Sequence, residues 1–369
     1  MNTTVTDVPA LIARASQAMQ ERRFEDAEAS LREAIELAPR DAALQYALAH
    51  SLYAQRRDDD ALAALDACLV RNPDHPPALL YRGILLEQFD RNDDAMVSFL
   101  RGVRTAERLG IAPSDPEMQR VAAHAAAVVA TALDQCLTEA LAPLVDRYGA
   151  KAIARIRAGA DVFVGKVQPD FPHPSWRPGL FYVPGLAPTA VYGDGACPAA
   201  DALRAAAADI HAEMRTALAA GAGDLYRAGE AIDSALARCP QTAQILAGME
   251  LAEVTGYGPT VAFVAVPAGV SIPPRFGPTN GRVVGQLVLQ APDTGARLSV
   301  GDEVRAYVAG DVMVFDDSFR HSIENAGRDD LHLLMFDLWN PQLTLAERDA
   351  FVAVLGAAQR FERRSDPSI

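Results

Sequence analysis

A short C-terminal stretch contains most of the residues whose side chains could bind a metal. His321 lies four residues after Asp317 and three before Glu324, so one imidazole and two carboxylates are close along the chain. Imidazole and carboxylate groups are ligands for transition metals, but this set is sparse for a stable site. The other histidines are scattered over helices and a linker and are expected to be structural; apart from His332, they are His50, His75, His124, His173 and His211.

A strand-turn-strand pattern precedes this stretch in "SIPPRFGPTNGRVVGQLVL", residues 271–289. The turn is Gly277-Pro278-Thr279-Asn280, and an alternating apolar strand follows it. On a strand, residues two apart share a face, so Arg282 and Gln286 are expected on one side. We identify five candidate pocket residues: Arg275, Asn280, Arg282, Gln286 and His321.

Short strand-like runs separated by Gly, Asp and Pro turns surround these residues. Such a series is typical of a β-sandwich or jelly roll. The runs are residues 260–269, 282–292, 296–318 and 331–341, after one helix at about 199–219. The stretch 166–198 contains seven prolines and indicates a linker that leads into this second domain.

The first third of the chain repeats with a period of 34 residues. Small residues recur at Ala27, Ala61 and Ala95, larger ones at Leu31, Leu65 and Phe99, and proline at Pro39 and Pro73. Small residues allow two helices to approach closely, and proline ends a helix because it has no backbone N–H to donate. The pattern resembles the tetratricopeptide repeat, an α-helical solenoid built of helical hairpins.

We expect three repeats in 8–112, capping and linker helices in 113–165, and the β-domain in 170–360. The cap is expected within 116–149, which is rich in alanine. A repeat array of this kind presents a groove to a peptide or protein ligand. The alternative is that it dimerises the chain or supports the C-terminal domain.

The charge and composition of the chain limit the classes of partner that it can bind. The chain of 369 residues has a formal net charge of −14, which disfavours nucleic acid and anionic membrane surfaces. The N-terminus lacks a basic and apolar signal pattern, and no run of 18 consecutive apolar residues occurs, so we expect a cytoplasmic protein. Four dispersed cysteines indicate neither a zinc site nor a disulfide framework.

Several motifs in order resemble the aspartyl/asparaginyl β-hydroxylase family. They are "RPGLFYVPGL" (177–186), "ARCPQTAQIL" (237–246), "GPTNGR" (277–282), "VGDEVRAYVAGDVMVFDDSFRH" (300–321) and "DLWNPQLTLAER" (337–348). The resemblance implies a double-stranded β-helix, a jelly roll of the cupin type. It also implies chemistry that uses Fe(II), 2-oxoglutarate and oxygen to hydroxylate the β-carbon of Asp or Asn in a peptide.

Carried over by position, the family's two iron-binding histidines correspond to His321 and Arg275. A guanidinium stays protonated and has no lone pair to offer a cation. The family's three 2-oxoglutarate ligands correspond to Val284, Leu331 and Gln286, and apolar residues cannot pair a desolvated dicarboxylate.

One nearby residue could restore part of the 2-oxoglutarate binding: Arg282 matches the family and shares a face with Val284. His332 is no substitute for Leu331, because neighbouring residues on a strand face opposite sides. Arg275 itself has two possible roles. It either binds an anion, such as a peptide carboxylate, or it fills the pocket left without iron and pairs with an internal carboxylate.

We therefore expect a degenerate, non-catalytic module that binds a peptide or protein through the repeat groove and the β-domain pocket. No cofactor is expected, with Fe(II) and 2-oxoglutarate required only if the family chemistry survives. Two alternatives remain: an active peptidyl Asp/Asn hydroxylase with atypical ligands, and different small-molecule chemistry in the same pocket. An oligomer is compatible with the sequence.

Overall fold

The computed structural model describes residues 7–113 and 115–364, which form two compact units. One unit contains the described residues up to Leu133 together with those from Arg360 onward, and the other contains Asp134–Gln359. This division does not test the three expected segments 8–112, 113–165 and 170–360, whose boundaries stay predictions.

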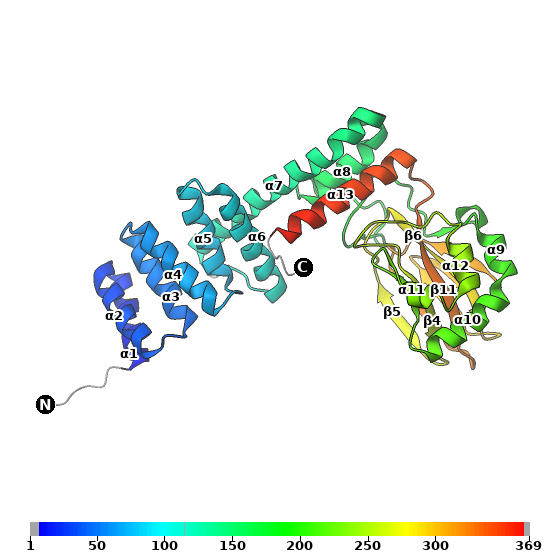
Figure 1. Cartoon of the computed structure of the whole chain (residues 1–369), viewed down its shortest axis with the longest axis horizontal. Helices are drawn as coiled ribbons and strands as arrows, with labels where there is room; N and C mark the ends of the chain where they lie inside the picture. Colours follow the sequence, from blue (N-terminus) through cyan, green and yellow to red (C-terminus); the bar gives the residue numbers. More distant parts are fainter. Residues whose placement is uncertain (1–6, 114, 365–369) are drawn as a thin grey trace. The chain divides into compact units, whose positions relative to one another are not determined.

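Six helices at the start of the first unit form three hairpins stacked in chain order, blue to cyan in Figure 1. The turn inside each hairpin holds one non-glycine residue with a positive φ: Arg22 (57°), Arg56 (61°) and Asp90 (57°). These residues are 34 apart, so the backbone repeats with the sequence. The helices are α1 (Val8–Gln20), α2 (Phe24–Leu37), α3 (Ala42–Ala54), α4 (Asp58–Arg71), α5 (Pro76–Gln88) and α6 (Asn92–Leu109).

The hairpins pack as the repeat pattern predicts. Ala27, Ala61 and Ala95 are at most 1% exposed, and the larger residues beside them, Leu31, Leu65 and Phe99, are at most 3% exposed. The third repeat places Gly83 where the first two have alanine. A methyl group on Gly83 would lie 2.3 Å from the Phe99 ring, so this glycine makes room for a side chain larger than leucine.

The helix expected as a cap is α7 (Pro116–Tyr148), and it is followed by η1 (Ala150–Ile153) and α8 (Ala154–Phe163). Among the described residues, α7 is the one helix long and apolar enough to cross a membrane, by length and composition alone. Core helices of soluble proteins pass the same test, so the expectation of no membrane contact stays a prediction.

The second unit contains two antiparallel sheets. One is ordered β1-β9-β6-β11-β4-β2-β3 and the other β5-β10-β7-β8. The strands of the first sheet are β1 (Val191–Tyr192), β2 (Asp224–Arg227), β3 (Glu230–Ala231), β4 (Val261–Val266), β6 (Arg282–Gln290), β9 (Val312–Phe315) and β11 (Leu331–Trp339). Those of the second are β5 (Ser271–Arg275), β7 (Ala296–Val300), β8 (Glu303–Ala306) and β10 (His321–Asn325). The expected helical array followed by a jelly-roll domain is confirmed.

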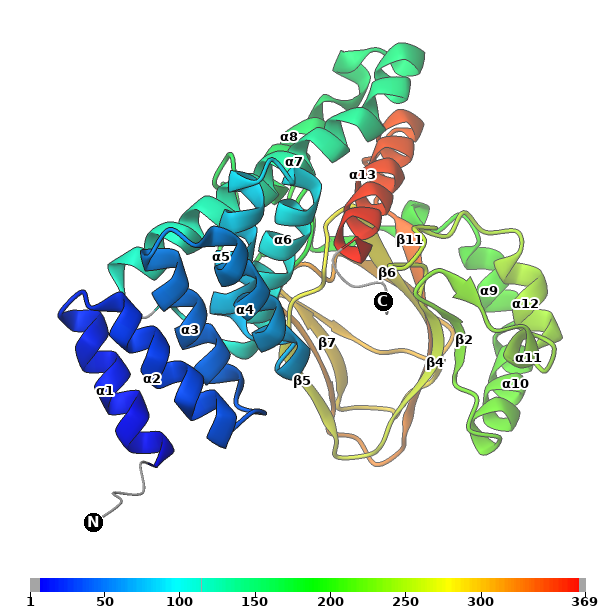
Figure 2. The same cartoon turned by 60° about the vertical axis from the view of Figure 1, so that its left-hand side comes forward.

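Short helices cover the outer face of the seven-stranded sheet, opposite the sheet that contains β5 and β7 (Figure 2). Ile210 and Met214 of one helix pack in a core with Leu287, Leu334 and Phe336 of the sheet. The inner face of the sheet is therefore formed by the alternate residues of the same strands. The covering elements are η2 (Asp194–Ala196), α9 (Ala200–Ala205), α10 (Ala207–Ala219), α11 (Asp233–Leu236) and α12 (Pro240–Leu246), and α13 (Leu345–Arg363) ends the described chain.

Candidate functional site

The turn between β5 and β6 is fixed by Asn280. Its side-chain oxygen accepts from the Val183 backbone N–H at 2.7 Å, and its amide donates to the Val183 carbonyl at 2.9 Å. Its own carbonyl accepts from the Asn340 side chain at 2.9 Å. Asn280 is fully buried, so this candidate pocket residue joins three segments of backbone.

Arg275 and His321 lie opposite each other on neighbouring strands β5 and β10. The His321 Nδ1 is 3.0 Å from the Phe319 carbonyl, which only accepts, so Nδ1 carries the proton. Arg275 Nε donates to the other ring nitrogen, Nε2, at 3.3 Å. Burial lowers the pKa of His321, and the Arg275 charge lowers it further. Arg275 thus occupies the imidazole lone pair, and its partner is this imidazole rather than the internal carboxylate considered from the sequence.

The carboxylates near His321 have other partners. Asp317 accepts from Arg282 at 3.0 Å and packs against Gly277, where a methyl group would lie 2.2 Å from its carboxyl carbon. Glu324 is paired with Arg297 at 2.6 Å. Asp316 accepts from the Ser318 backbone and hydroxyl and from the Trp176 indole, as expected for a turn residue. Burial raises its pKa to about 7.

Arg282 is held by two buried carboxylates. Its guanidinium donates to Asp317 at 3.0 Å and to Asp337 at 2.9 Å, and its side chain is 15% exposed. Asp337 accepts in addition from the Thr260 backbone N–H at 2.8 Å. Arg282 was expected only to share a face with Val284 and Gln286; Asp337, 55 residues further along the chain on β11, was not among the candidate residues. Period-two alternation within the "DLWNP" motif is the one signal that could have placed it on the same face.

The positions that correspond to the 2-oxoglutarate ligands form part of an apolar interior. Val284 is 5% exposed, and Leu331 and Gln286 are fully buried. The Gln286 carbonyl accepts from the Tyr307 hydroxyl at 2.9 Å, while its amide nitrogen has no partner within the described residues. His332 instead contacts His211 of α10, with 2.8 Å between ring nitrogens, which places it on the outer face as expected.

These residues do not fit a bound iron or 2-oxoglutarate. The lone pair of His321 is occupied, Arg282 is neutralised by two carboxylates, and apolar side chains stand where a dicarboxylate would need cations. In the described part of the chain, no group of three or more His, Cys, Asp or Glu side chains is placed to hold a metal. One buried oxygen, Asp317 Oδ1, lacks a donor there, and alone it makes no metal site.

An aromatic cluster in the repeats forms a second candidate site. His50 lies edge-on to Tyr46 and Tyr81, with ring centroids 4.7 and 4.5 Å apart, and it lines a cavity of about 330 Å³ beside α1 and α3. Burial raises the pKa of Tyr46, and the charge of Asp115 raises it further. The buried His50 Nε2 has no hydrogen-bond partner among the described residues. His75, by contrast, caps α5 by accepting from the Ala78 backbone N–H at 3.1 Å.

Comparison with known families matches both parts of the chain. Residues 210–341 match the family model "Aspartyl/Asparaginyl beta-hydroxylase", and residues 18–81 match "Tetratricopeptide repeat". The solved "TPR2B-domain:pHsp70-complex of yeast Sti1" aligns over 32% of this chain and 94% of its own, at 14% identity and a TM-score of 0.30.

Curated relatives align with the second unit over a limited length. Mouse "Aspartate beta-hydroxylase domain-containing protein 1" is 34% identical over 129 residues, which is 34% of this chain and 36% of the relative. Mouse "Aspartyl/asparaginyl beta-hydroxylase" is 28% identical over 131 residues, 35% of this chain and 17% of the relative. The chain thus spans little more than a third, or less, of these relatives.

Proposed function

We propose that this chain, which carries tetratricopeptide repeats and a C-terminal domain of the aspartyl/asparaginyl β-hydroxylase family, is a non-catalytic binding protein for a peptide or protein segment. The observation that carries the proposal is the hydrogen bond from Arg275 Nε to His321 Nε2. A permanent cation on the nitrogen that a metal would need supports a β-domain that keeps the family fold without binding iron.

The repeat cavity supports the binding role. His50 has a buried ring nitrogen without a partner in the described part of the chain, and a buried unsatisfied polar atom costs about 1–3 kcal/mol. A peptide N–H or C=O can satisfy it, depending on the tautomer. Asp115 and Glu117 act electrostatically on Tyr46 and Tyr81, so the surroundings are acidic as well as aromatic. Cations bind favourably to aromatic faces and to carboxylates, so the expected ligand is an apolar segment that carries Lys or Arg.

Binding of the full chain to a peptide array tests this role. The array pairs each apolar peptide carrying Lys with the same peptide carrying Glu. We expect the Lys peptides to bind more tightly, Tyr46→Ala to lose most of this binding, and Tyr46→Phe to keep it. Tyr226→Ala, on β2 of the other unit, is the matched control and leaves binding unchanged. Equal binding of Lys and Glu peptides, or unchanged binding by Tyr46→Ala, would contradict peptide binding at the cavity beside His50 and Tyr46.

A further inference from the structure

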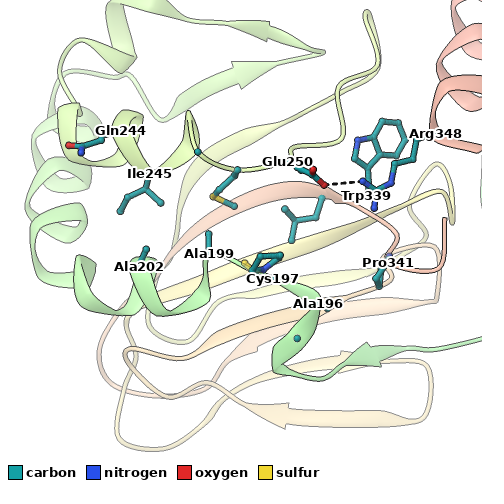
Figure 3. Close-up of a pocket in the computed structure, with 15 residues that line it drawn as sticks. Ala196, Cys197, Ala199, Ala202, Gln244, Ile245, Glu250, Trp339, Pro341 and Arg348 are labelled. Atoms are coloured by element: carbon teal, nitrogen blue, oxygen red, sulfur yellow. Dashed lines mark hydrogen bonds and ion pairs between the residues drawn. The ribbon is translucent and has the colours of Figure 1, made fainter. Parts of the chain in front are cut away.

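A large cavity lies on the outer face of the seven-stranded sheet. It has a volume of about 740 Å³, within the range of roughly 300–1,000 Å³ typical of small-molecule sites. Its walls come from the end of β11, from α9 and α12, and from the start of α13 (Figure 3). Leu338 lines it and belongs to the helix-covered outer core, whereas the neighbouring Asp337 binds Arg282 on the inner face. Neither His321 nor Arg275 lines this cavity, whereas Trp339 lines both it and a smaller cavity of about 170 Å³ beside Arg282.

The walls of this cavity are mostly apolar. Figure 3 shows Trp339 near Arg348 at one end and Ile245 near Gln244 at the other. Met249, Leu338 and Pro341 also line the cavity. Such walls remove the water shell of an aliphatic or aromatic body, which contributes roughly 25 cal/mol per Å² of apolar surface buried.

Arg348 supplies a polar group at the Trp339 end. One guanidinium nitrogen, Nη1, donates to Glu250 at 3.1 Å, and that carboxylate is 87% exposed. Exposed ion pairs of this kind are weak because water screens them. The Arg348 Nε–H is buried and has no acceptor within the described residues. Arg155 in the same unit shows the satisfied case, with two donors to Glu347 at 2.6 and 2.7 Å.

We propose that this cavity binds a small carboxylic acid with an aromatic or aliphatic body. The carboxylate accepts from Arg348, and the apolar body lies against Trp339, Met249 and Leu338. The orphaned Nε–H favours an acceptor, and a charged acceptor forms the stronger hydrogen bond with a guanidinium. Glu250 competes for the same guanidinium and therefore weakens the binding of an acid.

The test compares 1-naphthaleneacetate with its neutral amide, using calorimetry on the full chain and tryptophan fluorescence. Trp176 is fully buried, so quenching reports on Trp339; because Trp339 also lines the smaller cavity beside Arg282, the variants below locate the ligand. We expect the acid to bind about tenfold more tightly than the amide, the size of one charge-assisted hydrogen bond. Equal affinities for the two probes, or no binding of the acid at millimolar concentration, would overturn the proposal.

Three variants locate the binding. Arg348→Met should remove the preference for the acid, and Glu250→Gln should tighten acid binding several-fold. Because the Glu250 side chain is 87% exposed, its replacement leaves folding intact. Ala202→Phe fills the cavity from an exposed rim position and should weaken both probes. Acid preference that persists in Arg348→Met, weaker acid binding by Glu250→Gln, or unchanged binding by Ala202→Phe would each contradict the site.

Discussion

The arginines on the two sides of the seven-stranded sheet differ in how fully their hydrogen-bond donors are paired. On the inner face, Arg282 is 15% exposed and donates to two buried carboxylates, Asp317 and Asp337. On the outer face, Arg348 pairs with the exposed carboxylate of Glu250, and its buried Nε–H has no acceptor among the described residues. The two cations thus differ in their partners: the inner one is paired with buried carboxylates, and the outer one has a buried donor without an acceptor among the described residues.

The comparison shows that one sheet holds a paired arginine on one face and an incompletely paired arginine on the other. Inside, the Arg282 guanidinium pairs with Asp317 and Asp337, and the nearby Val284 and Leu331 are buried apolar residues. A guanidinium that already binds two carboxylates gains little from a third. Outside, a cavity of about 740 Å³ remains beside the unsatisfied donor. The potential to bind a small anion therefore lies on the outer face.

The largest expected effect is on the inner arginine. Arg282→Met leaves Asp317 and Asp337 buried without their shared cation, and removal of one partner of a buried pair costs about 3–5 kcal/mol. The free energy of unfolding, measured by urea denaturation, should fall by that amount. Arg282→Lys keeps the charge and should recover part of it. A loss below about 1 kcal/mol for Arg282→Met would show that the ion pairs of Arg282 with Asp317 and Asp337 contribute little to stability.

A smaller loss is expected at the inner turn. Asn280→Ala removes both hydrogen bonds to Val183, and the buried Val183 N–H loses its acceptor. An unsatisfied buried group costs about 1–3 kcal/mol, so unfolding should become easier by about that amount. Thr279→Ser, at the neighbouring buried position, keeps its hydroxyl and serves as the control. Unchanged stability in Asn280→Ala would mean that the turn holds without this side chain.

The outer arginine should matter little for stability. Arg348→Met breaks one ion pair with an exposed partner, and such pairs contribute about 0–1 kcal/mol. Its effect on urea denaturation should be several-fold smaller than that of Arg282→Met. Similar losses in the two variants would remove the contrast between the faces.

The smallest expected effect concerns pH at the outer pair His211 and His332. Burial lowers the pKa of both; each is lowered further by the charge on Arg215, and Asp330 opposes the shift at His332. The unfolded chain therefore binds protons that the folded chain does not, and stability is lost as pH falls below about 6.5. His332→Gln should lose less stability than the wild type between pH 7 and 5. An identical pH profile would contradict this sign.

The fold was largely readable from the sequence, because its signals are local. Repetition of Ala27 at Ala61 and Ala95 fixes helix packing within one hairpin at a time. Gly83 makes room for the large Phe99 ring, and both positions follow the 34-residue period. This steric match becomes evident only when the two helices are placed together.

The site was readable only in part, because its partners are distant in sequence. The loss of a metal ligand at Arg275 follows from residue type, whereas the bond from its Nε to His321 depends on cross-strand register and side-chain orientation. The pairing of Arg282 with Asp337 joins residues 55 apart; alternation within "DLWNP" indicates the face of Asp337 but not its partner. The outer cavity around Arg348 is formed by segments distant in sequence, and none of its lining residues was among the candidate site residues.

The most direct test of the central claim measures iron content and succinate formation by the purified full chain. The protein is loaded anaerobically with Fe(II) and 2-oxoglutarate, then exposed to air with a pool of Asp- and Asn-containing peptides, beside the Arg275→His variant and a protein-free control. We predict no stoichiometric iron and no succinate above the control in the wild type. Because Val284 and Leu331 still lack the charge for 2-oxoglutarate, Arg275→His should at most gain iron. Stoichiometric iron together with succinate formation by the wild type would contradict the account.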